Sequence, residues 1–254
     1  MSGLLENKVA LVTGGARGIG RQAAIVFARE GASVVVSDLS AAGVEDTVAS
    51  IKSAGGEAMS IIADVSNPSN IRSMVGTVIE VHGRLDCAFN NAGINGVQAG
   101  AGGQLTAEWS EESFDKVVQV NLKGTWLCMR AELEQMTNQG FGAIVNTASL
   151  AALTGFRTTA GYAASKHGIV GLTKTAALEY APRVRINCVC PGWTDTDMIS
   201  AAMARRGPEI LAGVPFGRMG TPEEIAQMVC WLLSDRASYV TGAAINVDGG
   251  VMAG

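Results

Sequence analysis

The segment Thr13–Gly20 (TGGARGIG) follows the apolar run Lys8–Thr13 and leads into an apolar stretch with the character of a helix. Glycine lets the backbone turn tightly and approach a ligand closely. A helix that begins at such a turn offers unpaired N–H groups and the positive end of its dipole to a pyrophosphate. The spacing is Gly-x-x-x-Gly-x-Gly, not the common Gly-x-Gly-x-x-Gly, but the strand–turn–helix context is the same. The residues of this segment expected at a dinucleotide are Gly14, Arg17, Gly18, Ile19 and Gly20.

Strand-like and helix-like segments alternate along the whole chain. The expected strands are Lys8–Thr13, Ser33–Asp38, Ala58–Ile62, Leu85–Asn90, Gly142–Thr147, Val184–Val189 and Ala243–Val247. The expected helices are about Gly18–Glu30, Ala41–Ser53, Asn70–His82, Ser110–Asn138, Tyr162–Tyr180 and Thr221–Leu233. This rhythm predicts an α/β fold, a doubly wound parallel sheet of about seven strands with helices on both faces. Ligands in such sheets lie beyond the carboxyl ends of the strands.

The composition is that of a globular protein with a large core. The chain has 254 residues, 48% of them hydrophobic and 17% charged, which suits one dinucleotide-binding and catalytic domain over residues 1–254. The net charge is −4 and no basic stripe occurs, so no nucleic-acid partner is expected. Met1–Lys8 lacks the apolar run of a signal peptide, and no stretch of about 18 apolar residues occurs. We therefore expect a cytoplasmic protein without a membrane partner.

The cysteines do not suggest a disulfide framework or a metal site. There are five of them, at positions 87, 128, 188, 190 and 230, and none forms a Cys-x-x-Cys pair. The chain has only two histidines. A structural zinc site would lack its usual ligands, so no metal is expected and the cysteines are interpreted as buried free thiols.

Asp38 lies at the end of the second expected strand, 18 residues beyond Gly20. A carboxylate in that position can accept hydrogen bonds from both ribose hydroxyls of an adenosine. Leu39 stands where the 2′-phosphate of NADP would favour an arginine, whereas Arg17 in the glycine segment could partly neutralise such a phosphate. On balance the pair Asp38-Leu39 predicts NAD as the cofactor.

Several further segments match one protein family in order and spacing. They are TGGARGIG (13–20), Asp64-Val65, Asn90-Asn91-Ala92-Gly93, Asn121, Ser149, Tyr162-Ala-Ala-Ser-Lys166 and Pro191-Gly192. Over nearly its whole length the chain resembles the single-domain short-chain dehydrogenases/reductases. The resemblance implies a Rossmann-like sheet, a nicotinamide cofactor and a proton relay of serine, tyrosine, lysine and asparagine, here Ser149, Tyr162, Lys166 and Asn121.

The chemistry of these four residues agrees with that role. Tyr162 and Lys166 are four residues apart and so share one face of a helix. A free tyrosine has a pKa of about 10, and a nearby ammonium lowers it by favouring the phenolate; the positive ring of NAD⁺ would add to this. Ser149 follows the expected strand Gly142–Thr147, and its hydroxyl can hold the substrate oxygen beside the phenol. The resemblance also assigns the nicotinamide ribose to Lys166, and to Asn121 a water that links Lys166 to solvent.

The other cofactor contacts rest on the resemblance. It assigns them to Asp64, Val65, Asn91, Ala92, Gly93, Tyr162, Lys166, Pro191, Gly192, Thr194 and Thr196. Asp64 and Val65 match the pair that meets the adenine, and Asn90 is expected to line the cofactor end of its strand with Gly93. The two threonines match the positions that bind the carboxamide. Thr194 replaces the commoner branched aliphatic residue, a change that a backbone contact would survive.

The segment 194–216 is expected to cover the substrate. Its apolar residues are Met198, Ile199, Met203, Ile210, Leu211, Val214 and Phe216. They suggest an apolar wall and an alicyclic, aromatic or other uncharged substrate, although they could equally pack the segment down. Arg205 and Arg206 could meet a substrate anion, but a solvated helix face is favoured for them.

The sequence therefore predicts an oxidoreductase that moves a hydride between NAD(H) and a secondary alcohol or ketone. Two alternatives remain: an NADP-dependent 3-oxoacyl-carrier reductase, which Asp38-Leu39 disfavours, and a non-catalytic nucleotide-binding regulator, which the intact relay disfavours. The expected helix Tyr162–Tyr180 is nearly apolar all round and contains Gly168 and Gly171, so it needs cover on more than one side. A homo-oligomer is expected, and the resemblance implies a tetramer.

Overall fold

The computed structural model describes residues 3–253, and its described part forms one seven-stranded parallel sheet. The strands are β1 (Val9–Thr13), β2 (Ser33–Asp38), β3 (Glu57–Ile62), β4 (Cys87–Asn90), β5 (Gly142–Thr147), β6 (Val184–Pro191) and β7 (Ala244–Val247). Their order is β3-β2-β1-β4-β5-β6-β7, and every neighbouring pair is parallel. The direction of winding reverses between β1 and β4, which is where ligands bind in open α/β sheets. The predicted fold class is confirmed.

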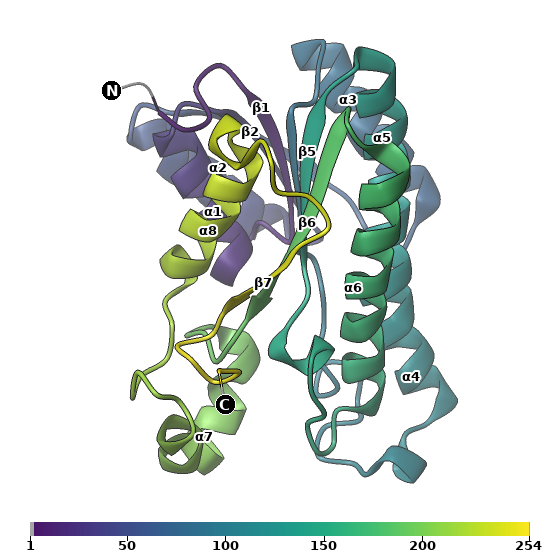
Figure 1. Cartoon of the computed structure of the whole chain (residues 1–254), viewed down its shortest axis with the longest axis vertical. Coiled ribbons are helices and arrows are strands. Elements are labelled where there is room, and N and C mark those ends of the chain that lie inside the picture. Colours follow the sequence, from purple (N-terminus) through teal and green to yellow (C-terminus); the bar gives the residue numbers. More distant parts are fainter. Residues whose placement is uncertain (1–2, 254) are drawn as a thin grey trace.

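Helices cover both faces of the sheet (Figure 1). On one face lie α1 (Gly18–Arg29), α2 (Ala41–Ser53) and α8 (Pro222–Leu233). On the other lie α3 (Pro68–His82), α5 (Gly124–Gln139) and α6 (Ala160–Tyr180). Each face buries its own apolar cluster, with Phe27 and Phe89 in one and Met74 and Ile144 in the other. The sheet is thus covered on both sides, and its carboxyl edge is left for ligands.

Two expected elements are corrected by the structure. The segment Ser110–Asn138, expected as one helix, is divided into α4 (Glu111–Val118), a π-helical turn η2 (Gln119–Lys123) and α5. The segment after β6, for which a helix face was favoured at Arg205 and Arg206 but no helix bounds were predicted, forms α7 (Asp197–Ala212), with a break at Arg206 (φ −135°, ψ 20°). Pro208 lies just beyond this break, and a proline has no N–H for the carbonyl one turn earlier.

The remaining expected segments agree with the structure to within two residues at either end. Clear local signals account for some of the boundaries. Thr221 begins α8 with a capping box, because its Oγ1 accepts the N–H of Glu224 at 3.2 Å and Glu224 Oε2 accepts the N–H of Thr221 at 2.7 Å. All five cysteines are buried and unpaired, as expected. Within residues 3–253, no helix combines the length and apolar character that crossing a membrane requires.

Candidate active site

The glycine loop, residues Thr13–Gly20, joins β1 to α1 at the carboxyl edge of the sheet. Gly14 and Gly18 have φ values of +68° and +55°, which favour glycine. A Cβ on Gly14 would lie 2.9 Å from the Cα of Ala92, and one on Gly20 would overlap the carbonyl oxygen of Gly14. The backbone of this loop is therefore packed directly against the turn that follows β4, with no room for side chains between them.

Hydrogen bonds fix the glycine loop to its neighbours. Thr13 Oγ1 accepts the N–H groups of Asn91 and Ala92 at 3.1 and 3.2 Å. Asn91 Nδ2 donates in return to the carbonyls of Thr13 and Gly14 at 3.3 and 3.2 Å. Asn91 and Ala92, both predicted at the cofactor, thus lie against the loop. The side chain of Asn91 is committed to holding that loop in place.

Asp38 ends β2 beside the glycine loop. Its Oδ2 accepts the N–H of Ala16 at 3.2 Å, and its Oδ1 accepts the N–H of Ser40 at 3.1 Å. These bonds fix the carboxylate and leave lone pairs on both oxygens for further donors. Leu39 is 67% exposed, and Arg17 is exposed at the tip of the loop. The three residues predicted to decide between NAD and NADP thus surround one end of the loop.

The structure brings together three of the predicted catalytic residues. Tyr162 and Lys166 lie in the first turns of α6, with Lys166 Nζ 5.7 Å from the centre of the Tyr162 ring. Ser149, just beyond β5, lies near enough to Tyr162 for its hydroxyl to lower the pKa of the phenol. Lys166 is 3% exposed, and its Nζ donates to the carbonyl of Thr147 at 2.6 Å. A phenol, a hydroxyl and an ammonium therefore converge at the carboxyl edge of β5.

Asn121, the fourth predicted relay residue, lies in the π-helical turn η2 and is fully buried. Its Oδ1 accepts the N–H of Ile94 at 2.8 Å, and its Nδ2 donates to the carbonyl of Ile94 at 2.9 Å and to Ser165 Oγ at 3.1 Å. A Cβ on Gly93 would lie 3.2 Å from Asn121 Oδ1 and 3.7 Å from Lys166 Nζ. Asn121, Gly93 and Lys166 are therefore neighbours, and a π-helical turn at such a place is typical of functional sites.

Burial dominates the electrostatics of this group. It raises the pKa of Tyr162, an effect that the hydrogen bond from Ser149 only partly offsets. It also lowers the pKa of Lys166 to about 8, against the attraction of the nearby thiols of Cys190 and Cys188. In the protein by itself the net shift in the pKa of Tyr162 is therefore upward, opposite to the shift expected from a nearby ammonium, because burial of the phenolate is the largest contribution.

The turn after β6 closes the site from the other side. A Cβ on Gly192 would lie 2.7 Å from the Cα of Asp248, so this turn is tightly packed. Thr194 is 4% exposed, and its Oγ1 donates to the carbonyl of Gly192 at 3.2 Å. Thr196 Oγ1 donates to the carbonyl of Thr194 at 3.4 Å, and its Cγ2 would lie 3.3 Å from a Cβ on Gly18. The segment that begins at Pro191 thus reaches the glycine loop.

Three further predicted residues follow β3 or end β4. Asp64 and Val65 follow β3, where Asp64 Oδ1 accepts the N–H of Ser66 at 2.8 Å and Val65 is buried. Asn90 does not line the cofactor edge as expected. Its side chain points into the interior and donates to Glu132 Oε2 at 2.9 Å and Asn146 Oδ1 at 3.1 Å. Successive residues of a strand face opposite sides of the sheet, and the buried polar partners take this one.

The sequence prediction missed Thr47, which lies in α2 and is fully buried. Its Oγ1 donates to the carbonyl of Gly15 at 3.0 Å and so supports the glycine loop from below. Thr47 occupies one of the buried positions of the helix, along with Val44, Val48 and Ile51. The sequence signal that could have identified Thr47 is its hydroxyl at an otherwise apolar position of an amphipathic helix.

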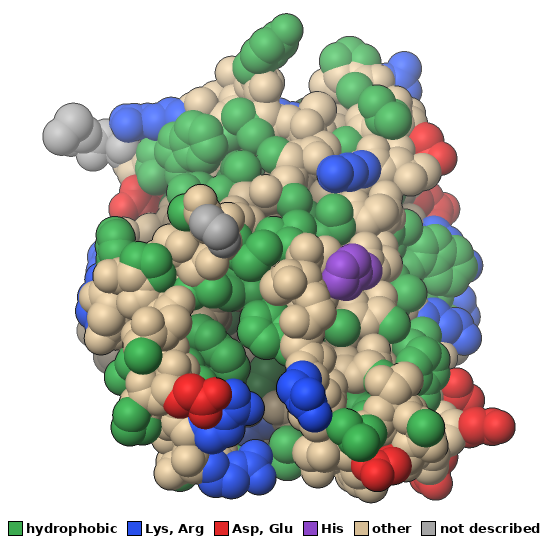
Figure 2. All heavy atoms as spheres, turned by 60° about the horizontal axis from the view of Figure 1, so that its bottom comes forward, with side chains coloured by type: hydrophobic (Ala, Val, Ile, Leu, Met, Phe, Trp, Pro, Cys, Tyr) green, Lys and Arg blue, Asp and Glu red, His purple; other side chains and the backbone are tan. Residues whose placement is uncertain are grey.

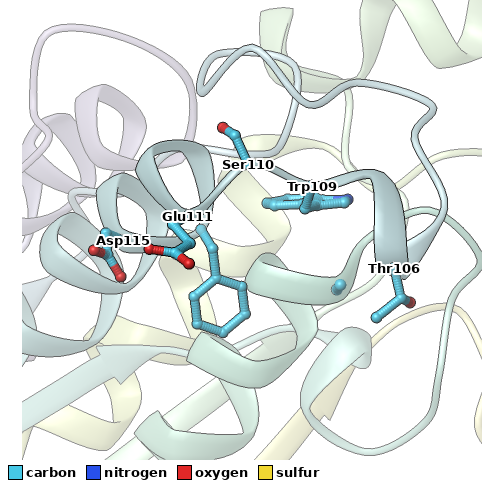
Figure 3. Close-up of a pocket in the computed structure, with 7 residues that line it drawn as sticks. Thr106, Trp109, Ser110, Glu111 and Asp115 are labelled. Carbon is cyan, nitrogen blue, oxygen red and sulfur yellow. The ribbon is translucent and has the colours of Figure 1, made fainter.

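Figure 2 turns the carboxyl edge of the sheet toward the reader and shows a recess lined by apolar side chains, with Lys and Arg side chains near its rim. A separate shallow pocket of about 310 Å³ lies beside the start of α6 (Figure 3). It is lined by Thr106, Trp109, Ser110, Glu111, Phe114, Asp115 and Ala160. None of these is a predicted site residue. The Trp109 ring would contact a Cβ on Gly161, next to Tyr162, so this pocket backs onto the wall of the site.

Comparison with known proteins agrees with this geometry. A family model described as enoyl-(acyl carrier protein) reductase matches residues 14–252. Cyclohexanol dehydrogenase of Acinetobacter sp. (strain SE19) is 43% identical, over 98% of this chain and 96% of its own. The crystal structure of levodione reductase superimposes with a TM-score of 0.92 at 37% identity, over 97% of this chain and 98% of its own. A gluconate 5-dehydrogenase candidate from Beutenbergia cavernae, crystallised with NADP at low occupancy, has a TM-score of 0.92 at 36% identity, over 98% of both chains.

The packing of the glycine loop makes one substitution diagnostic. Gly20→Ala adds a Cβ that would overlap the carbonyl of Gly14 and lie 2.6 Å from Asn91 Nδ2, so the loop must move. We expect NADH, titrated by its fluorescence, to bind at least about tenfold more weakly, and the protein to lose about 1–3 kcal/mol of stability. Gly76→Ala is the control, since a Cβ on Gly76 of α3 meets nothing within 4 Å. NADH affinity unchanged in Gly20→Ala would contradict a cofactor at this loop.

Proposed function

The chain belongs to the short-chain dehydrogenase/reductase family of oxidoreductases, and on that premise we propose that it transfers a hydride between NAD(H) and the carbinol or carbonyl carbon of a secondary alcohol or ketone. The observation that carries the proposal is the convergence of Ser149, Tyr162 and Lys166 beside Gly93, at the carboxyl edge of the sheet. The names of two relatives, cyclohexanol dehydrogenase and levodione reductase, favour a cyclic substrate of this kind.

The glycine loop fits a dinucleotide. Its glycines leave a backbone surface with no Cβ atoms, and the start of α1 supplies free N–H groups and the positive end of a helix dipole for a pyrophosphate. Asp38 would hold the ribose of the adenosine, and Asp64 with Val65 would meet the adenine. Lys166 would hold the nicotinamide ribose, and Thr194 and Thr196 the carboxamide. When bound, NAD⁺ supplies the hydride acceptor.

In the oxidation direction, the substrate hydroxyl would lie between Ser149 and Tyr162. Ser149 donates to or accepts from the substrate oxygen, and the Tyr162 phenolate takes its proton as the hydride leaves the carbon. In the reduction direction the Tyr162 phenol returns that proton. Because burial raises the pKa of Tyr162 in the protein by itself, with Lys166 already in place, the phenolate needs further positive charge, which the nicotinamide ring of NAD⁺ would provide. Asn121 would hold a water that connects Lys166 to solvent.

The segment 194–216, mostly α7, would cover the substrate. Asn95 Nδ2, in the loop after β4, donates to the carbonyl of Met198 at 3.0 Å, so the segment is tied across the carboxyl edge of the sheet. Arg206 forms an ion pair with Glu209 at 2.6 Å, and both side chains are exposed. That pairing supports a solvated face for Arg206 and an uncharged substrate.

The alternative, an NADP-dependent 3-oxoacyl-carrier reductase, draws support from the description of the matching family model. It is the weaker reading, because Asp38 is held at the loop and Leu39 offers no positive charge to a 2′-phosphate. A non-catalytic regulator would have no use for a buried lysine beside a phenol and a serine.

A homotetramer is the proposed assembly. The outward face of α6 carries Ala164, Gly171 and Leu178, all exposed, and Leu178 is 86% exposed. Trp126 on the adjacent α5 is 41% exposed. A second copy of this chain, packed on the small residues of α6, would bury these apolar groups.

Tyr162→Phe should lower kcat by about 10²–10⁴-fold while leaving NADH affinity within about twofold, because it removes the acid–base group and keeps the ring. Stopped-flow turnover with cyclohexanol and NAD⁺, together with NADH fluorescence titration, measures both. Tyr180→Phe, the same change at the far end of α6, is the control and should be neutral. A Tyr162→Phe enzyme that kept more than about a tenth of the wild-type kcat would rule out the relay.

The kcat/KM with NAD⁺ should exceed that with NADP⁺ by about 10–150-fold, which is the effect of losing one hydrogen bond from a ribose hydroxyl to a charged acceptor. The 2′-phosphate also brings negative charge toward Asp38. Asp38→Ala with Leu39→Arg should shift the ratio toward NADP⁺, whereas Asp46→Ala, an exposed aspartate of α2, should not. Equal wild-type efficiency with both cofactors would remove the basis for NAD.

Sedimentation at micromolar protein should show a tetramer. Gly171→Gln should break it into smaller species, because a long side chain then stands on the packed face of α6. Gly76→Gln is the matched control on α3, since a Cβ at either glycine meets nothing within 4 Å in one chain. A wild-type protein that sediments only as a monomer would refute the assembly.

A further inference from the structure

Glu132 lies in the middle of α5 and is fully buried. Its Oε2 accepts a hydrogen bond from Asn90 Nδ2 at 2.9 Å. Its Oε1 has no hydrogen-bond partner among residues 3–253, and the same is true of Asn90 Oδ1. A buried carboxylate without an ion pair is costly and rare. Asp86 shows the usual solution, since it is 4% exposed but accepts from Arg84 Nε at 2.8 Å and from the N–H of Val9 at 2.9 Å.

Among residues 3–253, no positive charge shifts the pKa of Glu132. The strands β4 and β5 and the helix α6 bring Asn90, Asn146 and Thr173 to this cluster, and none of them ionises. The buried residues of α3 are apolar (Ile71, Met74, Val75 and Val78), and its last residue, His82, has a buried Nε2 but is not among the groups that shift the pKa of Glu132. The titratable group coupled to Glu132 is Cys128, one turn earlier on α5, whose pKa the carboxyl helps to raise. On β6, the thiols of Cys188 and Cys190 are the ionisable side chains buried on this side of the sheet.

The hydrogen-bond inventory of the pair lacks one donor. Both N–H groups of the Asn90 amide are used, one by Glu132 Oε2 and one by Asn146 Oδ1. The two atoms left without partners, Glu132 Oε1 and Asn90 Oδ1, are both acceptors when the glutamate is ionised. A proton on Oε1 converts one of them into a donor for the other. The neutral acid and the amide would then form a ring of two hydrogen bonds.

We propose that the folded protein holds Glu132 as a neutral carboxylic acid whose Oε1–H donates to Asn90 Oδ1, and that this pair positions the turn that follows β4. The proton comes from solvent as the chain folds. Burial raises the pKa of Glu132 to about 7, although the hydrogen bond from Asn90 works in the opposite direction. The acid is therefore neutral below about pH 7 and loses its proton to water above it.

The pair lies beneath the proposed active site. Asn90 directly precedes Asn91, Ala92 and Gly93, which pack on the glycine loop and on Asn121. Through Asn90, Glu132 also holds Asn146, whose Nδ2 donates to Thr173 Oγ1 on α6 at 3.0 Å. The cluster thus joins β4, β5 and α6. The turn after β4 contains Asn91, Ala92 and Gly93, Ser149 follows β5, and α6 carries Tyr162 and Lys166. Glu132 is thus a positioning residue. This positioning role rests on the proposed function, whereas the protonation state of Glu132 does not.

Three variants separate the charge of Glu132 from its shape. Glu132→Gln offers one N–H and one carbonyl to Asn90, the same pattern as the neutral acid, and does not titrate. Glu132→Met keeps the volume and leaves both ends of the Asn90 amide without a partner on α5. Glu134→Gln makes the same charge change at an exposed position of the same helix and is the control.

Urea unfolding between about pH 5 and 8, at one protein concentration, tests the protonation state. The folded pKa of about 7 lies above the unfolded value of about 4.3, so the proton stabilises the fold fully at low pH and this stabilisation is lost as the pH rises to about 7. The folded-to-unfolded ratio of wild type should fall by up to about two orders of magnitude relative to Glu132→Gln over this range, and Glu134→Gln should follow wild type. A difference between wild type and Glu132→Gln that does not change with pH would overturn the neutral acid.

Infrared spectra and NADH titration complete the test. A carboxylic-acid carbonyl band should be present in wild type at about pH 5.5, weaken as the pH rises through about 7, and be absent in Glu132→Gln. Absence of that band in wild type would refute the pair. Glu132→Met should weaken NADH binding at least about tenfold, while Glu132→Gln stays within about twofold of wild type at pH 6. Equal NADH affinity in Glu132→Met and wild type would refute the positioning role alone. Wild type that binds no NADH would instead contradict the proposed function, and the infrared spectra would still test the hydrogen-bonded pair of Glu132 and Asn90.

Discussion

The close approach of two backbones is the constraint on which the site depends. The glycine loop after β1 and the turn after β4 pack so closely that a Cβ on Gly14 or Gly20 would collide with its neighbour. That contact exists because β1 and β4 are adjacent at the point where the sheet reverses its winding. It brings a surface of bare N–H groups to the carboxyl edge, and it places Gly93 next to Asn121 and Lys166. Ser149, just after β5, and Tyr162 and Lys166, on α6, lie at the same edge, so the proposed cofactor site and the proposed proton-transfer residues would meet there.

Much of this arrangement follows from the sequence. The parts that do not follow from it have a cause in common. Strands and most helices are predicted to within two residues, because their apolar periodicity and glycine turns are local signals. The π-helical turn at Asn121 is not local, since it depends on hydrogen bonds to Ile94 in a different loop. The bounds of α7 escaped prediction because Pro208 interrupts the helix. The upward shift in the pKa of Tyr162 depends on burial, which spacing along a helix does not report.

The directions of the polar side chains in the interior were also not predictable from the sequence. Asn90 belongs to a motif that suggests contact with a cofactor, yet its side chain faces the other way, toward Glu132 and Asn146. Sequence patterns identify which residues lie at an edge, but the direction of each side chain follows from its partners on other elements. Here those partners form a buried polar cluster beneath the site, whose hydrogen-bonded members among residues 3–253 include one acid and no cation. The hydrogen bonds of that cluster link β4, β5 and α6. The relative placement of these three elements sets the distance between Tyr162 and the turn after β4.

Hydride transfer itself is the central claim, and the fate of the hydrogen on the carbinol carbon tests it directly. A panel of cyclic and aryl secondary alcohols, each carrying deuterium at the carbinol carbon, would be incubated with the enzyme and NAD⁺, and the recovered nicotinamide examined by proton NMR. One deuterium should appear at C4 of the reduced ring, on a single face, for every ketone formed. Reduced cofactor without deuterium, or deuterium released to water, would contradict it.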